Sequence, residues 1–242
     1  MDSMNSLINR PRTKRGRITL NNILNAAAQV IYEKGYHEAS IKDITSRAGV
    51  ASGTFYVYFE GKHHLYKYLL LQCSHMIRKH LNLSTKHCTT RREKERTGMR
   101  VWLEFLLKNR FMFHIVWEAL YVDKQLFMDY YGSFCIAYMR GLNADKDTDE
   151  VRDIDSEVLA YMLMGATNFF GLNWILFKEN GHMEIDLVVN EFMKILDGGI
   201  FNSNFVPQTE TETIRFEVFS EDDLDDDEDE DEIPDPGDFL LQ

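Results

Sequence analysis

The chain has 242 residues, of which 44% are hydrophobic and 12% aromatic, and this composition excludes a wholly disordered or fibrous protein. Residues 1–80 hold 12 basic and 5 acidic side chains, residues 81–209 hold 14 and 18, and residues 210–242 hold 1 and 16. The basic first third would attract a polyanion that the acidic end repels. Because no apolar run reaches the roughly 18 residues that a membrane helix needs, we expect a soluble, cytoplasmic protein without a membrane partner.

The first 35 residues divide into an arm and a helix. Residues 1–16 carry several basic side chains and few apolar ones, which predicts a flexible basic arm. From Leu20 to Ile31, apolar residues recur at intervals of three and four. This spacing predicts an amphipathic helix, and Gly35 is expected to end it.

Residues 40–59 are expected to form a helix-turn-helix. Ser40, followed three positions later by Asp43, fits a capping box at the start of a helix. Gly49 can adopt a positive φ and end that helix after about two turns. After two intervening residues, a third short helix is expected over residues 52–58. Two short helices joined by such a turn define the motif.

The rest of the chain also predicts helices. A long amphipathic helix begins near His63, whereas residues 84–98 are polar and charged and are expected to form a loop or a frayed helix end. Asp123 and Asp155 fit the N-caps of later helices. These helices are expected over residues 124–142, 156–178 and 186–197, the last ended by Gly198 and Gly199.

The C-terminal residues differ from everything before them. Thr213 to Phe219 alternate between apolar and polar side chains as a strand would. Residues 221–232 are acidic except for Leu224, so self-repulsion and the lack of apolar surface predict disorder from about residue 220. The predicted fold class is therefore all-α, with a three-helix head, a larger helical domain and a disordered acidic tail.

Residues 40–59, which read SIKDITSRAGVASGTFYVYF, carry a family resemblance. Together with Lys34-Gly35-Tyr36 before them and Lys62 after them, they resemble the DNA-binding signature of the TetR family of bacterial transcription regulators. The resemblance extends over residues 17–77. Three positions depart from the usual family pattern: Thr45 stands where Ala is usual, Ala51 where Ser or Thr is common, and Gly61 where a small polar residue is usual.

The helix-turn-helix residues divide into two faces. Apolar residues such as Ile44 and Phe55 are expected to face inward, which leaves polar residues and Val57 facing outward toward a major groove. The resemblance implies that Tyr56 and Lys62 hold phosphates and that Thr54 contacts a base or the backbone. For Tyr58 a core position is the alternative. The candidate DNA-contacting residues are Lys42, Thr45, Ser52, Gly53, Thr54, Tyr56, Val57, Tyr58 and Lys62, with Arg12, Lys14, Arg15 and Arg17 in an adjacent minor groove.

The central helices are rich in aromatic and methionine residues, which suit an apolar ligand site. The resemblance implies an effector site there and a dimer interface on the last two long helices. Candidate effector residues are Trp102, Phe105, Phe113, His114, Trp117, Glu118, Tyr121, Tyr138 and Asn168. Candidate dimer residues are Phe169, Phe170, Asn173, Trp174, Phe177, Phe192, Ile195 and Leu196. Each of these residues also fits an ordinary position in the core.

Other chemistry finds little support in the sequence. Three unpaired cysteines do not predict disulfides. Cys73, His80 and His87 recur every seven residues, about 10.5 Å along a helix, which is too far apart for tetrahedral zinc. There is no phosphate-cradling glycine loop, G-x-S-x-G or H-E-x-x-H motif. We therefore expect no enzyme activity, no metal and no cofactor.

The domains are expected as a basic arm (1–16), a helix-turn-helix DNA-binding domain (17–77), a helical effector-binding and dimerisation domain (78–205) and an acidic tail (206–242). The predicted function is that of a transcriptional regulator. It would be a repressor that binds a palindromic operator in double-stranded DNA as a homodimer and is released by a small hydrophobic effector, fatty acyl or multidrug-like. The alternative is an architectural DNA-binding protein that does not respond to ligands. The tail would either compete with DNA for the basic arm or act only as a solubilising segment.

Overall fold

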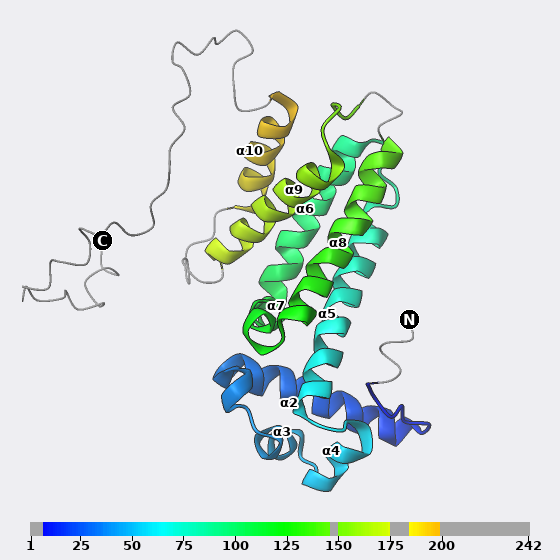
Figure 1. Cartoon of the computed structure of the whole chain (residues 1–242), viewed down its shortest axis with the longest axis vertical. Helices are drawn as coiled ribbons and strands as arrows, with labels where there is room; N and C mark the ends of the chain where they lie inside the picture. The colour runs from blue at the N-terminus through cyan, green and yellow to red at the C-terminus, as the bar shows by residue number, and fades with distance from the viewer. Residues whose placement is uncertain (1–6, 146–149, 175–183, 199–242) are drawn as a thin grey trace, which may run out of the picture. The chain divides into compact units, whose positions relative to one another are not determined.

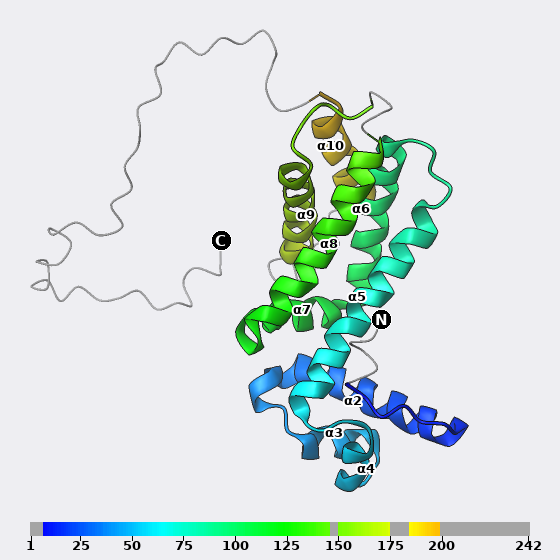
Figure 2. The same ribbon diagram turned by 45° about the vertical axis from the view of Figure 1, so that its right-hand side comes forward.

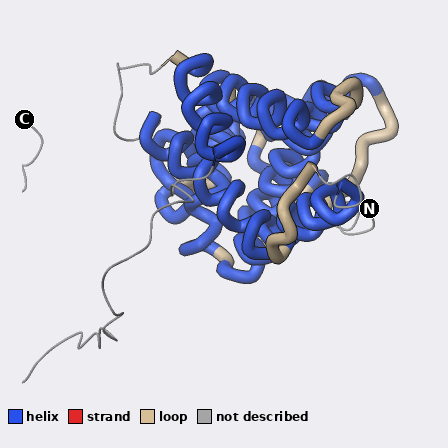
Figure 3. Tube along the Cα trace, turned by 90° about the horizontal axis from the view of Figure 1, so that it is seen from above, coloured by secondary structure: helices blue, strands red, loops and turns tan. Residues whose placement is uncertain are grey.

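The computed structural model describes residues 7–145, 150–174 and 184–198. All regular secondary structure in these ranges is helical (Figure 3), which confirms the predicted all-α fold class. The strand expected at 213–219, the acidic tail and the end of the helix expected at 156–178 lie outside the described residues. None of the helices in the described ranges is both long and apolar enough to cross a bilayer.

Helix α2 (Lys14–Glu38) is the longest element of the N-terminal part. It begins three residues before the predicted domain boundary because the Thr13 hydroxyl accepts a hydrogen bond from the Gly16 N–H. Its apolar face, including the fully buried Ile23 and Ile31, packs into the core. The expected end at Gly35 is a kink, where φ is +78° and one further turn follows.

Helices α3 (Ile41–Ala48) and α4 (Ser52–Tyr58) form the predicted helix-turn-helix. The capping box is present, since the Ser40 hydroxyl accepts from the Asp43 N–H and the Asp43 carboxylate accepts from the Ser40 N–H. Gly49 ends α3 at φ +69°. We refer to α2, α3 and α4 together as the head.

The basic arm is ordered over its described part, contrary to the sequence-based expectation. Leu7 and Ile8 are buried in the same core as the head. The Asn9 N–H donates to the Tyr58 carbonyl at 3.0 Å, and the Asn9 side chain donates to the Val57 carbonyl. Two adjacent apolar side chains are therefore sufficient to attach this segment to the end of α4.

Helices α5 (Lys62–Thr85) and α6 (Arg91–Lys108) form an antiparallel pair above the head. The expectation of a loop over 84–98 is wrong from residue 91 onward. A second capping box joins Thr90 and Glu93, and the Glu150 carboxylate accepts the N–H groups of Arg91 and Arg92. These acceptors satisfy the free donors of the first turn, so a charged segment can be helical.

The remaining helices are α7 (Arg110–Val122), α8 (Lys124–Asp145), α9 (Ser156–Leu172) and α10 (Ile185–Gly198). The N-caps expected at Asp123 and Asp155 are confirmed, because each carboxylate accepts two N–H groups of the following turn. Helix α10 packs on α6, to which it is held by Arg92–Asp197 and Arg100–Asp186 ion pairs.

Two hydrophobic cores divide the helices, and helix α7 packs with the head. The first core joins α2, α3, α4 and the start of α5 to Ile115, Val116 and Ala119 of α7. The second lies among α6, α8, α9 and α10. Figure 1 and Figure 2 show α7 lying between α2 and the lower ends of α6 and α8, with α5 passing beside it to the head. The core of the head thus extends beyond the boundary expected at residue 77.

The kink at Gly35 gives the first testable prediction. A Cβ added at this position would lie 3.1 Å from Oε1 of Glu118, and the residue that carries it would have to keep a positive φ. We expect Gly35→Ala to lower the free energy of unfolding by about 1 to 2 kcal/mol, measured by urea denaturation. The control is Gly132→Ala within α8, where no atom lies within 4 Å of the added Cβ; it should raise stability by about 0.5 to 1 kcal/mol. Equal effects at the two positions would contradict the role given to the kink.

Candidate functional site

Helix α4 presents a small exposed surface. Tyr56 and Val57 are 57% and 60% exposed, although neighbouring aromatic side chains of this helix are buried. Ser52 and Gly53 in the first turn are exposed as well, and Thr54 is half-buried. The structure therefore brings five of the predicted contact residues to one short helix, with their side chains or backbone accessible.

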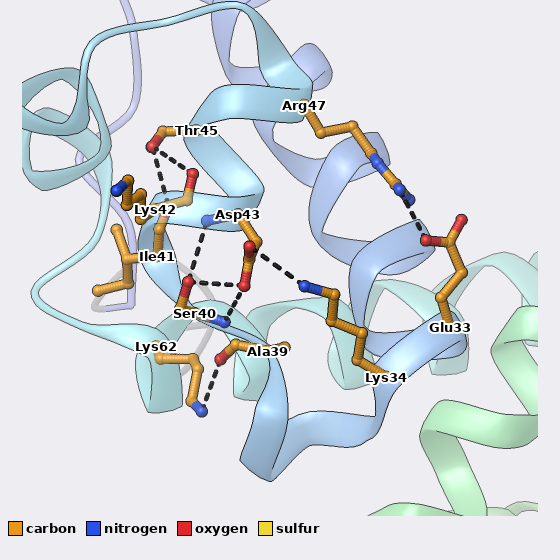
Figure 4. Close-up of polar contacts among 10 residues, drawn as sticks. All are labelled: Glu33, Lys34, Ala39, Ser40, Ile41, Lys42, Asp43, Thr45, Arg47 and Lys62. Atoms are coloured by element: carbon orange, nitrogen blue, oxygen red, sulfur yellow. Dashed lines mark hydrogen bonds and ion pairs between the residues drawn. The ribbon is translucent and has the colours of Figure 1, made fainter.

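Basic side chains flank this helix on two sides. Lys42 of α3 is exposed, and Figure 4 draws no hydrogen bond or ion pair to its ammonium among the residues shown. On the other side, the Tyr58 hydroxyl donates to the Gly16 carbonyl at 3.1 Å and joins α4 to the start of α2. The exposed basic residues of that start are Arg12, Lys14, Arg15 and Arg17.

Two predicted contact residues belong instead to the core. Thr45 is 1% exposed, and its hydroxyl donates to the carbonyls of Ile41 and Lys42 within α3. Tyr58 is buried, and its hydroxyl is used on Gly16. Both side chains stabilise the head and neither is available at the surface.

Lys62 has a different role from the phosphate contact that was expected. Its ammonium donates to the carbonyls of Tyr36, His37 and Ala39 at 2.7 to 3.2 Å, and it lies 4.4 Å from the centre of the Tyr36 ring. Figure 4 shows the side chain directed at the Ala39 carbonyl. Three carbonyls at the end of α2 thus use all three donors of the ammonium, and Lys62 fixes α5 to the kinked end of α2.

Ion pairs hold α3 against α2 in a fixed orientation. Hydrogen bonds from Ser40, followed by that from Lys34, lower the pKa of Asp43 to about 2. Arg47 pairs with Glu33 at 2.6 Å one turn further along (Figure 4). The Asp43 contribution to stability is present above the ordinary pKa of the carboxyl and is lost as the pH falls from there toward 2, so the head keeps this contact at neutral pH.

A cavity of about 380 Å³ lies among helices α5, α6, α8 and α9. Its end far from the head is polar and charged, with Asn82, Thr85, Arg91, Lys94 and Glu95. Its end near the head is mainly aromatic, lined by Trp102, Tyr130, Tyr131 and Phe134. Such a gradient suits an elongated ligand with a polar group at one end and an apolar chain at the other.

A buried polar network forms part of the cavity wall. Arg91 pairs with Glu95, and the Tyr138 hydroxyl donates to the same carboxylate. The guanidinium of Arg91 also lies 4.9 Å from the centre of the Tyr138 ring. Burial, followed by the nearby Glu95 charge, raises the pKa of Tyr138 well above its ordinary value, so its hydroxyl remains a proton donor at neutral pH.

The structure divides the predicted effector residues into three groups. Trp102, Tyr138 and Asn168 line the cavity, whereas Phe105 and Phe113 line a smaller void beside it. Tyr121 is 81% exposed and lines neither space. The other three residues of α7 also line neither space. His114 contacts the Tyr32 ring, Trp117 packs between Phe113 and Phe127, and Glu118 accepts from the Tyr36 N–H.

The expected effector residues omitted the charged lining of the cavity. Arg78 of α5 was missed, although it follows the apolar Cys73 and Ile77 on the same helix. Lys94 and Glu95 were missed because their segment was expected to be a loop. A helical reading of residues 91–98 would have placed them one turn before Met99, on the face that lines the cavity.

The candidate dimer residues are also redistributed. Phe169 of α9 and Ile195 of α10 are exposed, and Phe170, Asn173 and Leu196 are half-buried. Trp174 and Phe192 were predicted to lie in the dimer interface, but they are not surface residues, because both are buried in the second core. Phe177 lies outside the described residues. On α9 and α10, the exposed apolar side chains that the sequence did not single out are Val158, Tyr161, Met162 and Leu187.

Comparison with known proteins agrees with this geometry. The family described as bacterial regulatory proteins, tetR family, matches residues 23–69, which run from α2 into α5. This match identifies residues 23–69 as similar to the DNA-binding domain of that family. Over 40 residues the chain is 50% identical to the fatty acid metabolism regulator protein of Bacillus subtilis, which is 16% of this chain and 21% of that protein. The chain spans about a fifth of the length of the first curated relatives it matches.

Solved structures extend the fold similarity to most of the chain. The fatty acid degradation regulator FadR from Bacillus halodurans superposes with a TM-score of 0.69 at 20% identity, covering 79% of this chain and 98% of that one. FadR from Bacillus subtilis, solved in complex with stearoyl-CoA, gives a TM-score of 0.64 at 19% identity over 75% and 100%. The helices after the head therefore have the fold of these tetR-type regulators.

Proposed function

We propose that this protein is a DNA-binding transcriptional regulator that reads a major groove with helix α4. The observation that carries the proposal is the exposure of Tyr56 and Val57 on a short helix that follows the capped helix α3. Both helices lie within the residues that match the tetR family. A Val side chain can contact a thymine methyl, and a Tyr hydroxyl can donate to a phosphate.

In this proposal, the basic side chains that flank α4 contact the DNA phosphates. Lys42 on one side and Arg12, Lys14, Arg15 and Arg17 on the other are exposed and bracket the recognition helix. Lys62 is not among them, because its ammonium is occupied by the carbonyls of α2. The charge that attracts DNA therefore comes from α3 and the start of α2.

Replacing Lys42 by Ala tests this assignment. The DNA probe is the segment upstream of the protein's own gene. Binding is measured by fluorescence anisotropy at several salt concentrations. The loss of one phosphate contact should weaken binding and reduce the slope of log affinity against log salt by about 1. Lys79→Ala, an exposed lysine on α5 outside the head, is the matched control. If both variants bind with the wild-type salt slope, Lys42 does not contact the backbone.

We further propose that two copies associate through α9 and α10. Val158, Tyr161, Met162 and Phe169 form an exposed apolar stripe along α9, and Ile195 adds to it on α10. A stripe of this kind is costly in water and suits a self-complementary partner. A two-fold dimer of this head would read the two halves of a palindromic operator.

Phe169→Glu tests the dimer. Phe169 is 67% exposed in the single chain, so the substitution should leave the fold intact but place two charges near the two-fold axis. We expect the wild type to sediment as a dimer and the variant as a monomer with weaker operator binding. Tyr121→Glu, at an exposed site on α7, should remain dimeric. A Phe169→Glu dimer of wild-type strength would place the interface elsewhere.

The cavity supports an amphipathic effector, and we propose a fatty acyl compound. Its apolar walls fit an acyl chain, and Arg91 and Lys94 at the polar end supply positive charge for an anionic group. The complex of Bacillus subtilis FadR with stearoyl-CoA and the fatty acid regulator among the relatives support this class. By this proposal the ligand-free dimer holds its operator as a repressor, and the ligand releases it.

Addition of palmitoyl-CoA to the protein–operator complex distinguishes the two candidate functions. A regulator of the proposed kind should release a specific palindrome, because the ligand stabilises a state with lower affinity for DNA. An architectural protein should bind DNA with little sequence preference and show no response. Gel-shift titration with the upstream segment and with a shuffled segment of equal length separates these outcomes. Sequence-independent binding that the ligand does not change would refute the proposal.

A further inference from the structure

The cavity ends, on the side of the head, at a partition built from three helices. Four residues line both the large cavity and the small void beyond it and so stand between the two spaces: Trp102 of α6, Tyr130 and Tyr131 of α8, and Asn168 of α9. The Tyr131 hydroxyl donates to Oδ1 of Asn168 at 3.2 Å, and the Asn168 amide donates to the Met164 carbonyl at 2.7 Å. The partition is thus held by hydrogen bonds, and its position is fixed.

The void beyond the partition is small and closely surrounded. It measures about 20 Å³ and is lined by Met112, Phe113 and Val116 of α7. This is room for about one water molecule, or for one small group of a chain. A Cβ added at Gly171 would lie 2.9 Å from Leu106, so α9 already packs closely on α6 here. A group larger than the void can enter only if the surrounding side chains, or a helix that carries them, move.

Helix α7, which forms a wall of this void, is attached to the DNA-binding side. The Ile115 carbonyl accepts from the Tyr66 hydroxyl at 2.6 Å, and Glu118 accepts from the Tyr36 N–H at the kink of α2. Ile115, Val116 and Ala119 are buried in the core of the head. A displacement of α7 at Val116 therefore acts directly on the orientation of α2.

The polar end of the cavity fixes the direction in which an acyl ligand would lie. Arg91, Lys94 and Glu95 are at the far end, so an anionic group there points the chain toward Trp102 and the partition. A short chain would end inside the large cavity. A longer chain would reach the partition and enter the void against α7.

We propose that Trp102, Tyr131 and Asn168 set the acyl-chain length at which this protein releases DNA. Chains that stop before the partition bind without release, and chains that pass it displace α7 and release the operator. This inference rests on the proposed acyl effector, and it adds the distinction between binding and response.

The test measures binding and release separately. A homologous series of saturated acyl-CoA thioesters, with a parallel series of free fatty acids to separate the two head groups, is titrated into the full-length protein. Calorimetry reports binding, and anisotropy of labelled operator reports release. We expect binding to begin at a shorter chain than release does. If the two begin at the same length, the inference is wrong although the acyl effector stands; if no acyl compound binds, both fail.

Two variants locate the limit at the partition. Trp102→Leu enlarges the space at the partition, so release should begin at a chain at least one step longer in the series, while long chains still bind. Tyr131→Phe removes the hydrogen bond to Asn168 but keeps the ring, so the limiting chain should release DNA about fivefold more effectively. Trp174→Leu, a buried tryptophan of the second core that lines neither space, should leave the limit unchanged. An unchanged limit in both partition variants would overturn the inference, as would an equal shift in the control.

Discussion

The hydrogen bond from the Tyr36 N–H to the Glu118 carboxylate is the contact on which the arrangement of this protein depends. It joins α7 to the kinked end of α2 across 82 positions of sequence. A Cβ at Gly35 would lie 3.1 Å from the same carboxylate oxygen, so Glu118 would have to shift to make room for it. The second oxygen of Glu118 is buried and has no hydrogen-bond partner among the described residues. A half-satisfied buried carboxylate is costly, which suits a contact that must change.

The packing around this contact explains why the head and the cavity need not be independent. Helix α7 contributes to the core of the head, and Val116 of this helix also lines the small void beside the cavity. Lys62 completes the connection by fixing the start of α5, which itself lines the cavity further along, to the end of α2. By the function proposed above, a ligand in the cavity would act on the recognition helix through α5 and α7, each of which contacts both the head and the cavity side.

Local sequence signals predicted the elements that local contacts determine. The capping box of Ser40 and Asp43, the N-caps at Asp123 and Asp155 and the end of α3 at Gly49 all depend on neighbours within a few residues. Contacts between distant residues could not be predicted in this way. The start of α6 is stabilised by Glu150, 59 positions away, and Lys62 was expected at a phosphate because its carbonyl partners appear only after α2 and α5 meet. Glu118 and Asn168 were both predicted as effector residues, but only the fold shows that one faces the head and the other the cavity.

The most direct measurement is the ratio of operator affinities without and with saturating palmitoyl-CoA, compared between the wild type and Glu118→Leu. If α7 transmits the effect through its hold on Tyr36, the ratio should fall toward one in the variant, while the ligand's affinity for the DNA-free protein stays the same. A wild-type ratio in Glu118→Leu, with ligand binding intact, would contradict this coupling.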